Sequence, residues 1–164
     1  MTQRMNYTQA SPGGFKAMRQ LQEYVENSGL EHKLMELVKM RASQINGCAY
    51  CLDMHSKDAR AGGETEQRLY ALNAWREAPF YSERERAALA WTEALTKISK
   101  GPVSDELYAE VRKQFSEKEL VDLSLAIIAI NGWNRLAIPF RSEPGHYQPG
   151  AYAKSTKAAK PAAA

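Results

Sequence analysis

The sequence predicts an all-α protein of about six or seven helices. Apolar residues recur every three or four positions along most of the chain, and no run of alternating polarity is long enough to indicate a strand. The chain of 164 residues, 44% of them hydrophobic, has the size and apolar content of one domain with a buried core. We therefore expect a single helical bundle over residues 1–149 and a disordered Ala/Lys-rich tail over residues 150–164.

The first two predicted helices are delimited by local stop and start signals. The first begins at Ser11-Pro12, a favourable cap and first-turn pair, and ends before Asn27-Ser28-Gly29. The second begins at Glu31 and ends at Asn46-Gly47, because glycine readily adopts the left-handed conformation that terminates a helix. Both segments carry apolar residues at helical spacing: Phe15, Met18, Leu21 and Val25 in the first, and Leu34, Leu37, Val38, Ala42 and Ile45 in the second.

The third predicted helix spans residues 48–61, and a Cys-x-x-Cys motif (CxxC) lies at its N-terminus. Cys48, Cys51 and His55 are three and then four positions apart, so both sulfurs and the imidazole lie on one helix face. Gly62-Gly63 ends the segment.

The remaining predicted helices follow from capping signals and apolar spacing. Thr65 begins a short helix that reaches Leu72, and Ser104 begins another that reaches Val111. Two capping boxes, Ser82 with Glu85 and Ser116 with Glu119, open helices that continue to Ile98 and to Ile130. Because residues 120–130 are apolar on nearly all sides, we expect that helix at the centre of the bundle or in a subunit interface.

Composition favours a protein that acts in the cytoplasm without nucleic acid. The first twenty residues lack the basic start and apolar run of a secretory signal, and no stretch approaches the roughly 18 apolar residues of a membrane span. The net charge is +3, but three lysines lie in the tail, which leaves the rest of the chain about neutral. A neutral body lacks the basic face that phosphate binding requires.

The two cysteines require a chemical explanation. In a chain of cytosolic appearance, paired thiols are usually catalytic, redox-sensing or metal-binding. Zinc normally takes four ligands, and only Cys48, Cys51 and His55 are close in sequence; covalent haem needs histidine where Leu52 stands. A thioredoxin-like setting would need a preceding strand. The CxxC motif therefore favours a redox-active dithiol, with two buried structural thiols or a structural zinc site as the alternatives.

Glu36 is a candidate partner of His55. If the second and third helices form an antiparallel hairpin about Asn46-Gly47, the two residues lie within one turn of the same level. A carboxylate behind an imidazole, with a thiol one turn away, makes a weak thiol nucleophile reactive. The alternative is that Glu36 is a solvated carboxylate and His55 a surface residue.

Two arguments disagree about which cysteine is the nucleophile. Cys48 lies nearer the positive end of the helix, which stabilises a thiolate. His55, however, is four residues from Cys51 and seven from Cys48, so the base is better placed for Cys51. We favour Cys51.

Glu36, Cys48, Tyr50, Cys51 and His55 together form a pattern that resembles the alkylhydroperoxidase D-like group of the carboxymuconolactone decarboxylase superfamily. The resemblance extends over about residues 30–140. It implies an all-helical protomer in a homotrimer or homohexamer that reduces alkyl hydroperoxides or hydrogen peroxide. Cys51 would be oxidised to a sulfenic acid, Cys48 would resolve it as a disulfide, and Glu36, Tyr50 and His55 would relay protons.

The same resemblance implies no bound cofactor and no metal. The redox-active Cys48–Cys51 disulfide would be reduced by an external dithiol or protein reductant. Decarboxylation is not expected, because that branch of the superfamily works without this dithiol. A protein of another class, a non-catalytic redox sensor or binding protein that uses the dithiol as a switch, remains the alternative.

Several other residues carry weaker expectations. We expect the three tryptophans in the core or an interface rather than around a substrate: Trp75, Trp91 and Trp133. Asn131, Asn134 and Arg135 are expected to form hydrogen bonds within a subunit interface. Ile45-Asn46-Gly47 recurs as Ile130-Asn131-Gly132, a weak sign of an internal repeat.

Overall fold

The computed structural model describes residues 2–151, and over that range it contains helices and no β-strand. The predicted all-α class is therefore confirmed. The predicted disordered tail lies, apart from its first two residues, outside the described residues. The α-helices are α1 (Tyr7–Ala10), α2 (Pro12–Glu26), α3 (His32–Asn46), α4 (Ala49–Ala61), α5 (Glu66–Tyr70), α6 (Glu83–Thr96), α7 (Asp105–Arg112) and α8 (Glu117–Phe140), with 3₁₀ turns at Leu72–Ala74 and Ile98–Lys100.

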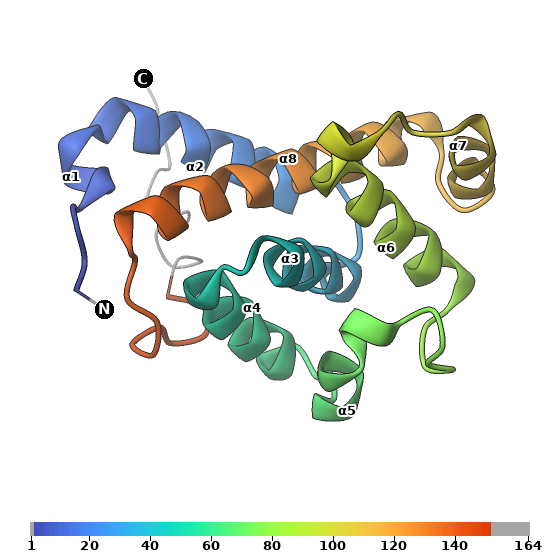
Figure 1. Cartoon of the computed structure of the whole chain (residues 1–164), viewed down its shortest axis with the longest axis horizontal. Helices are drawn as coiled ribbons and strands as arrows, with labels where there is room; N and C mark the ends of the chain where they lie inside the picture. The colour runs from blue at the N-terminus through green and yellow to red at the C-terminus, as the bar shows by residue number, and fades with distance from the viewer. Residues whose placement is uncertain (1, 152–164) are drawn as a thin grey trace, which may run out of the picture.

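Helix α3 lies at the centre of the bundle (Figure 1). It packs against α4, α6 and α8, and α2 lies along the opposite side of α8. Leu37 and Val38 on α3 are fully buried, each in a different apolar cluster. The N-terminal segment lies against the end of α8, because the Arg4 amide donates a hydrogen bond to the Phe140 carbonyl over 3.0 Å.

The predicted hairpin of α3 and α4 is confirmed. Gly47 has φ 70° and ψ 35°, the left-handed conformation that ends α3, and the Cys48 amide donates to the Ser43 carbonyl over 3.0 Å. Cys48 is extended and caps α4. The cysteines thus lie at the N-terminus of the expected helix, which is fourth in the chain because a short helix, α1, precedes the others.

Helix α1 was not predicted, and α8 is longer than predicted. The four residues of α1 are too few for a periodic pattern, and the side chain of Asn6 caps them by accepting from the amides of Thr8 and Gln9. Helix α8 continues ten residues past Ile130 to Phe140. Gly132 stays helical there, and a Cβ at this position would lie 2.8 Å from Cε of Met18, so glycine allows α2 to approach closely.

Both predicted capping boxes are present. At the start of α6 the Ser82 hydroxyl accepts from the Glu85 amide, and the Glu85 carboxylate accepts from the Ser82 amide. Ser116 and Glu119 make the same two bonds at the start of α8. Among the described residues, α8 is the one helix long and apolar enough to cross a membrane, with a mean hydropathy of 1.2. It packs against α2, α3 and α6, as the core helix of a bundle does.

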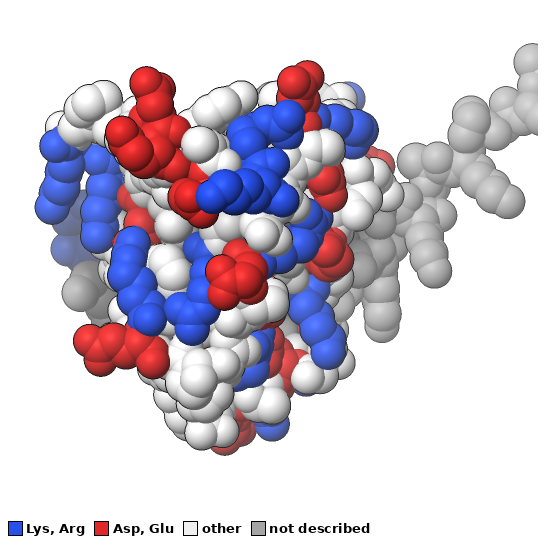
Figure 2. Space-filling model, turned by 90° about the vertical axis from the view of Figure 1, so that its right-hand side faces the viewer, with Lys and Arg blue, Asp and Glu red and all other residues white. Residues whose placement is uncertain are grey.

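Charges are mixed on the molecular surface. Figure 2 shows acidic and basic side chains interspersed on the face that carries α7, without a large area of one sign. The expectation that nucleic acid is not a partner stays a prediction.

The left-handed turn at Gly47 leads to a first test, on stability. Gly47→Ala should lower the free energy of unfolding by about 1 kcal/mol, because no Cβ contact hinders the change and the cost comes from the positive φ. Chemical denaturation measures the loss. Gly13→Ala is the matched control: Gly13 is helical and equally open, so alanine there should raise stability by up to about 0.5 kcal/mol. Equal effects at the two positions would contradict this explanation.

Candidate active site

A cavity of about 310 Å³ lies beside the first turn of α4. Residues from α1, α2, α3, α4, α8 and the segment after α8 line it. Cys51 lines the cavity together with polar side chains from three helices: Arg19, Gln22 and Glu26 of α2, His32, Glu36 and Lys39 of α3, and His55 and Asp58 of α4. Aromatic and other apolar side chains also line it: Tyr7, Phe15, Tyr50, Met54, Trp133, Ala137 and Tyr147. Four of the five predicted site residues thus line one cavity, and the fifth, Cys48, lies beneath it in a small apolar cluster with Cys51.

The two cysteines are free thiols and each is 1% exposed. The Cys51 amide donates to the sulfur of Cys48 over 3.4 Å. Cys48 is the N-cap residue of α4, and its side chain accepts this bond as N-cap side chains do. A hydrogen bond from the Cys51 thiol, aided by the amides of Cys51 and Tyr50, lowers the pKa of Cys48 against the effect of burial. The pKa of Cys51 is raised, because its thiol donates to Cys48 and because it is buried.

The dithiol therefore divides its chemistry between two sulfurs. Cys48 is the more acidic thiol but does not line the cavity, whereas Cys51 lines the cavity and holds its proton. A molecule in the cavity meets Cys51 first. Cys51 needs a base before it can attack.

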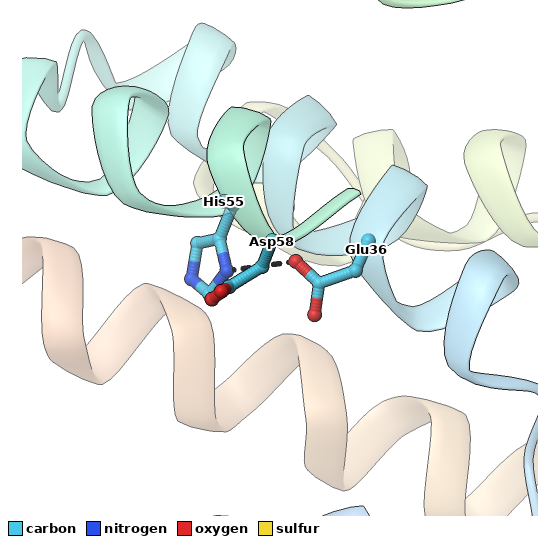
Figure 3. A group of neighbouring side chains, drawn as sticks. All are labelled: Glu36, His55 and Asp58. Carbon is cyan, nitrogen blue, oxygen red and sulfur yellow. Dashed lines mark hydrogen bonds and ion pairs between the residues drawn. The ribbon is translucent and has the colours of Figure 1, made fainter. Parts of the chain in front are cut away.

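His55 and Glu36 are in direct contact, as the hairpin register predicts. Nδ1 of His55 lies 3.0 Å from Oε2 of Glu36, and Figure 3 shows the two side chains facing each other from neighbouring helices. Glu36 is 2% exposed, so the alternative of a solvated carboxylate is wrong; His55 is also buried.

Lys39 completes the ion pairs of Glu36. Its Nζ lies 2.8 Å from Oε1 of Glu36, and the lysine is itself buried. Burial alone would raise the pKa of Glu36, but the hydrogen bond from His55 and the charge of Lys39 outweigh it and lower that pKa to about 2. Sequence reasoning missed Lys39, although its position three residues after Glu36 on one helix was a usable signal.

The ionised carboxylate determines which nitrogen of His55 carries the proton. Glu36 accepts, so Nδ1 must donate, and in the neutral imidazole Nε2 is then unprotonated. Figure 3 shows Nε2 on the far side of the ring from Glu36. When the ring is neutral, Nε2 is therefore the nitrogen that can accept a proton.

Asp58 was not among the predicted residues, although it lies three positions after His55. One ligand atom each from Glu36, His55 and Asp58 lie within 4.8 Å of one another (Figure 3), a set of donors that a divalent metal can use. Both carboxylates already have partners in the chain: Lys39 for Glu36, and Tyr147 for Asp58. A cation here would replace interactions that the protein makes itself.

Tyr147 reaches the site from beyond α8. Its hydroxyl donates to Asp58, 2.9 Å from each carboxylate oxygen. Burial and this bond raise the pKa of Tyr147, so the phenol keeps its proton and remains a donor. No local sequence signal connects Tyr147 with Cys51, because the contact depends on how the chain returns after α8.

Asn134 supports both sulfurs from α8. Its side chain forms hydrogen bonds with Cys48 and Cys51 that lower the pKa of each. The same amide donates to the Ser43 hydroxyl over 3.2 Å and accepts from Asn46 over 2.8 Å. The expectation that Asn134 serves a subunit interface is therefore wrong: the residue is fully buried within one protomer.

The two Ile-Asn-Gly segments are joined by a hydrogen bond between their asparagines. Asn46 at the end of α3 donates to Asn131 in the middle of α8 over 2.9 Å. Arg135 donates to Asn131 in turn, so these residues also make their bonds within the protomer.

The expectation for the tryptophans is confirmed for two of them. Trp75 and Trp91 are buried in the core. Trp133 instead lines the cavity, where its ring and that of Phe15 of α2 form a T-shaped pair at a centroid distance of 5.9 Å.

Comparison with known proteins identifies close relatives. The model of the carboxymuconolactone decarboxylase family matches residues 12–94 of this chain. The uncharacterized protein YdfG of Bacillus subtilis is 49% identical over 138 residues, which cover 84% of this chain and 94% of YdfG.

Solved structures share the fold. The crystal structure of a protein of unknown function from Agrobacterium tumefaciens, a candidate antioxidant defence protein AhpD, superposes with a TM-score of 0.86 at 47% identity, covering 89% of this chain and 100% of that one. The debrominase Bmp8 superposes with a TM-score of 0.75 at 23% identity, covering 85% of this chain and 75% of its own.

The buried Glu36 leads to a prediction on stability and pH. Glu36→Gln should lower the free energy of unfolding by about 3 kcal/mol near neutral pH, because the Lys39 charge loses its buried partner. The pKa of Glu36 is lower in the folded protein than the roughly 4.3 of an exposed glutamate. Its contribution is therefore complete above that value and is lost as the pH falls towards 2.

Urea denaturation at several pH values measures this difference. Glu110→Gln, on the exposed surface of α7, is the control and should change stability by less than about 0.5 kcal/mol. A difference between wild type and Glu36→Gln that stays constant down to pH 2 would contradict the assignment of the low pKa to Glu36.

Proposed function

This chain is an alkylhydroperoxidase D-like member of the carboxymuconolactone decarboxylase family, and on that premise we propose that it is a thiol-dependent peroxidase. The observation that carries the proposal is the placement of a CxxC cysteine, Cys51, on the wall of a cavity that also contains a buried histidine–carboxylate pair. Thiol, base and orienting acid are the groups that activate a cysteine for attack.

The first step oxidises Cys51. Nε2 of His55 takes the proton of the Cys51 thiol, and Glu36 stabilises the imidazolium that results. The thiolate attacks the outer oxygen of the hydroperoxide: the S–O bond forms, the O–O bond breaks, and sulfur supplies the electron pair. The departing alkoxide takes the proton from His55 and leaves as the alcohol. Cys51 is now a sulfenic acid.

The second step uses Cys48, whose pKa is lowered. Its thiolate attacks the Cys51 sulfur, so the S–S bond forms and the S–O bond breaks. Hydroxide leaves and is protonated to water, and the Tyr50 hydroxyl on the cavity wall is a further proton carrier for this exchange. The lower pKa of Cys48 suits the resolving role, and Cys48 does not line the cavity.

An external dithiol or protein reductant closes the cycle. Thiol–disulfide exchange returns Cys48 and Cys51 to the free thiols and oxidises the reductant to its disulfide. This mechanism uses the redox-active disulfide of the chain itself and requires no bound cofactor.

The cavity favours an organic hydroperoxide over hydrogen peroxide. Its volume of about 310 Å³ is several times the roughly 30 Å³ that one water molecule occupies, and aromatic side chains form much of its wall. Hydrogen peroxide would leave most of this apolar surface uncovered, whereas an organic group would bury it.

Assembly into a homotrimer or homohexamer is part of the proposal. Val121 and Ile128 on α8 are exposed, although α8 is the most apolar helix, and such residues suit contact with a second copy of the chain.

A redox sensor that uses the same dithiol is the second candidate, and the burial of both sulfurs favours it. Thiols that are 1% exposed are poorly accessible to a protein reductant. Repeated peroxide consumption in the presence of a dithiol supports the peroxidase. One oxidation per chain, without turnover, supports the sensor.

The cysteine variants test the order of attack. With dithiothreitol as reductant, Cys51→Ser should consume no organic hydroperoxide, because the sulfur on the cavity wall is lost. Without an added reductant, Cys48→Ser should consume about one equivalent and stop at the sulfenic acid, since no protein thiol resolves it. Dimedone labelling followed by mass spectrometry locates the sulfenic acid. Labelling of Cys48 in Cys51→Ser, with an inert Cys48→Ser, would reverse the two roles.

Variants of the relay test the base. His55→Gln and Glu36→Gln should each lower kcat/KM for peroxide by about 100-fold, because the thiol loses its base or the base loses its orientation. Stopped-flow oxidation of the free thiols measures the same step directly. Glu110→Gln, a surface change of the same chemistry, should keep wild-type rates. Wild-type thiol oxidation in folded His55→Gln would rule out the relay.

A further inference from the structure

The segment that follows α8, residues 142–150, returns along α4 and is bound to it by polar contacts. The Gly145 amide donates to Asp53 over 2.9 Å. Lys57 donates to the carbonyls of Gly145 and Tyr147, each over 3.2 Å, and the Gly150 amide donates to Asp58 over 3.3 Å. We call residues 142–150 the return segment. Its position is determined by one polar face of α4.

The return segment delivers one aromatic side chain to the cavity. Tyr147 is 9% exposed and lines the cavity together with Cys51 and His55. Its hydroxyl is held by both oxygens of Asp58 and its carbonyl by Lys57, so the ring is restrained at both ends of the residue. A side chain held in this way forms a firm wall.

Further aromatic walls come from α2 and α8. Phe15 and Trp133 pack edge to face at 67°, and the indole Nε1 of Trp133 donates to Gln22 over 3.1 Å. Gln22 lines the same cavity, so this bond holds the indole in place at the cavity wall. The cavity that Cys51 lines therefore has aromatic side chains from α1, α2, α4, α8 and the return segment in its wall.

We propose that this cavity is a binding site for a compact apolar group, of about the size of one aromatic ring with a short branched substituent, and that Tyr147 determines the size of group it accepts. The proposal rests on the proposed peroxidase function, since the bound group is the organic part of the hydroperoxide. The volume of about 310 Å³ lies at the lower end of the range of ligand sites, about 300–1,000 Å³. A fused two-ring group would need the space that Tyr147 occupies.

Binding of product alcohols tests the proposal without turnover. Isothermal titration calorimetry of the full chain compares 2-phenylpropan-2-ol with 2-(2-naphthyl)propan-2-ol. Wild type should bind the phenyl alcohol more tightly. Tyr147→Ala should reverse or remove this preference, with a change of about 10-fold in the ratio of the two dissociation constants. Tyr147→Phe, which keeps the ring and loses the bond to Asp58, should shift the ratio in the same direction by less.

Two further variants test whether the effect comes from the position of Tyr147 at the cavity or from the loss of any tyrosine. Tyr70→Ala removes a tyrosine that is 75% exposed on α5 and should leave the ratio unchanged. Lys57→Ala releases the carbonyls of Gly145 and Tyr147 and should shift the ratio of the two dissociation constants in the direction expected for Tyr147→Ala. Lys57→Ala therefore tests the proposal even if Tyr147→Ala does not fold.

The outcomes distinguish this inference from the proposed function. If wild type binds neither alcohol, or if folded Tyr147→Ala and Lys57→Ala both keep the wild-type ratio, the binding site and the role of Tyr147 are wrong, whatever the peroxidase assay gives. If the ratio changes as expected while wild type consumes no organic hydroperoxide, the binding site stands and the peroxidase proposal fails.

Discussion

The buried carboxylate of Glu36 is the constraint on which the rest of the site depends. A charge that is 2% exposed is tolerable only if nearby groups replace its lost hydration, and here Lys39 and His55 do so from two helices. Meeting that requirement aligns α3 with α4, because the bond to His55 forms at one register of the hairpin. The same register places Cys51, one turn before His55, on the wall of the cavity. Compensating one charge therefore positions both the base and the thiol.

What could be predicted from the sequence was what local chemistry determines. The capping boxes at Ser82 and Ser116 and the left-handed Gly47 act within a few residues, so their patterns sufficed. The contact of Glu36 with His55 could be predicted because, in a helical hairpin, positions in the sequence determine which residues lie level with each other. Tyr147 could not be found in this way: its contact with Asp58 spans 89 residues and depends on the direction the chain takes after α8. The polar role of Asn134 was recognised but was assigned to an interface, because burial inside a protomer leaves no local mark.

The division of properties between the two cysteines resolves the conflict between the two arguments from sequence. The helix N-terminus does favour a thiolate at Cys48, as position in the helix suggested, and three kinds of donor contribute: the Cys51 thiol, main-chain amides and Asn134. Proximity to the base and the cavity favours Cys51, as spacing suggested. In the proposed cycle the two arguments describe different steps, attack by Cys51 and resolution by Cys48. The motif serves both steps because Cys48 caps α4 and Cys51 lies in its first turn.

The hydrogen bonds to the Cys48 sulfur also bear on the energetics of reduction. They stabilise a negative charge that exists in the dithiol form and disappears when the sulfur joins a disulfide. Stabilising the reduced form of a couple shifts its reduction potential upward, by about 30 mV for each 1.4 kcal/mol. In the proposed cycle Asn134, which reaches both sulfurs from α8, would thereby make the Cys48–Cys51 disulfide a stronger oxidant. A reductant of only moderate strength would then be enough to close the proposed cycle.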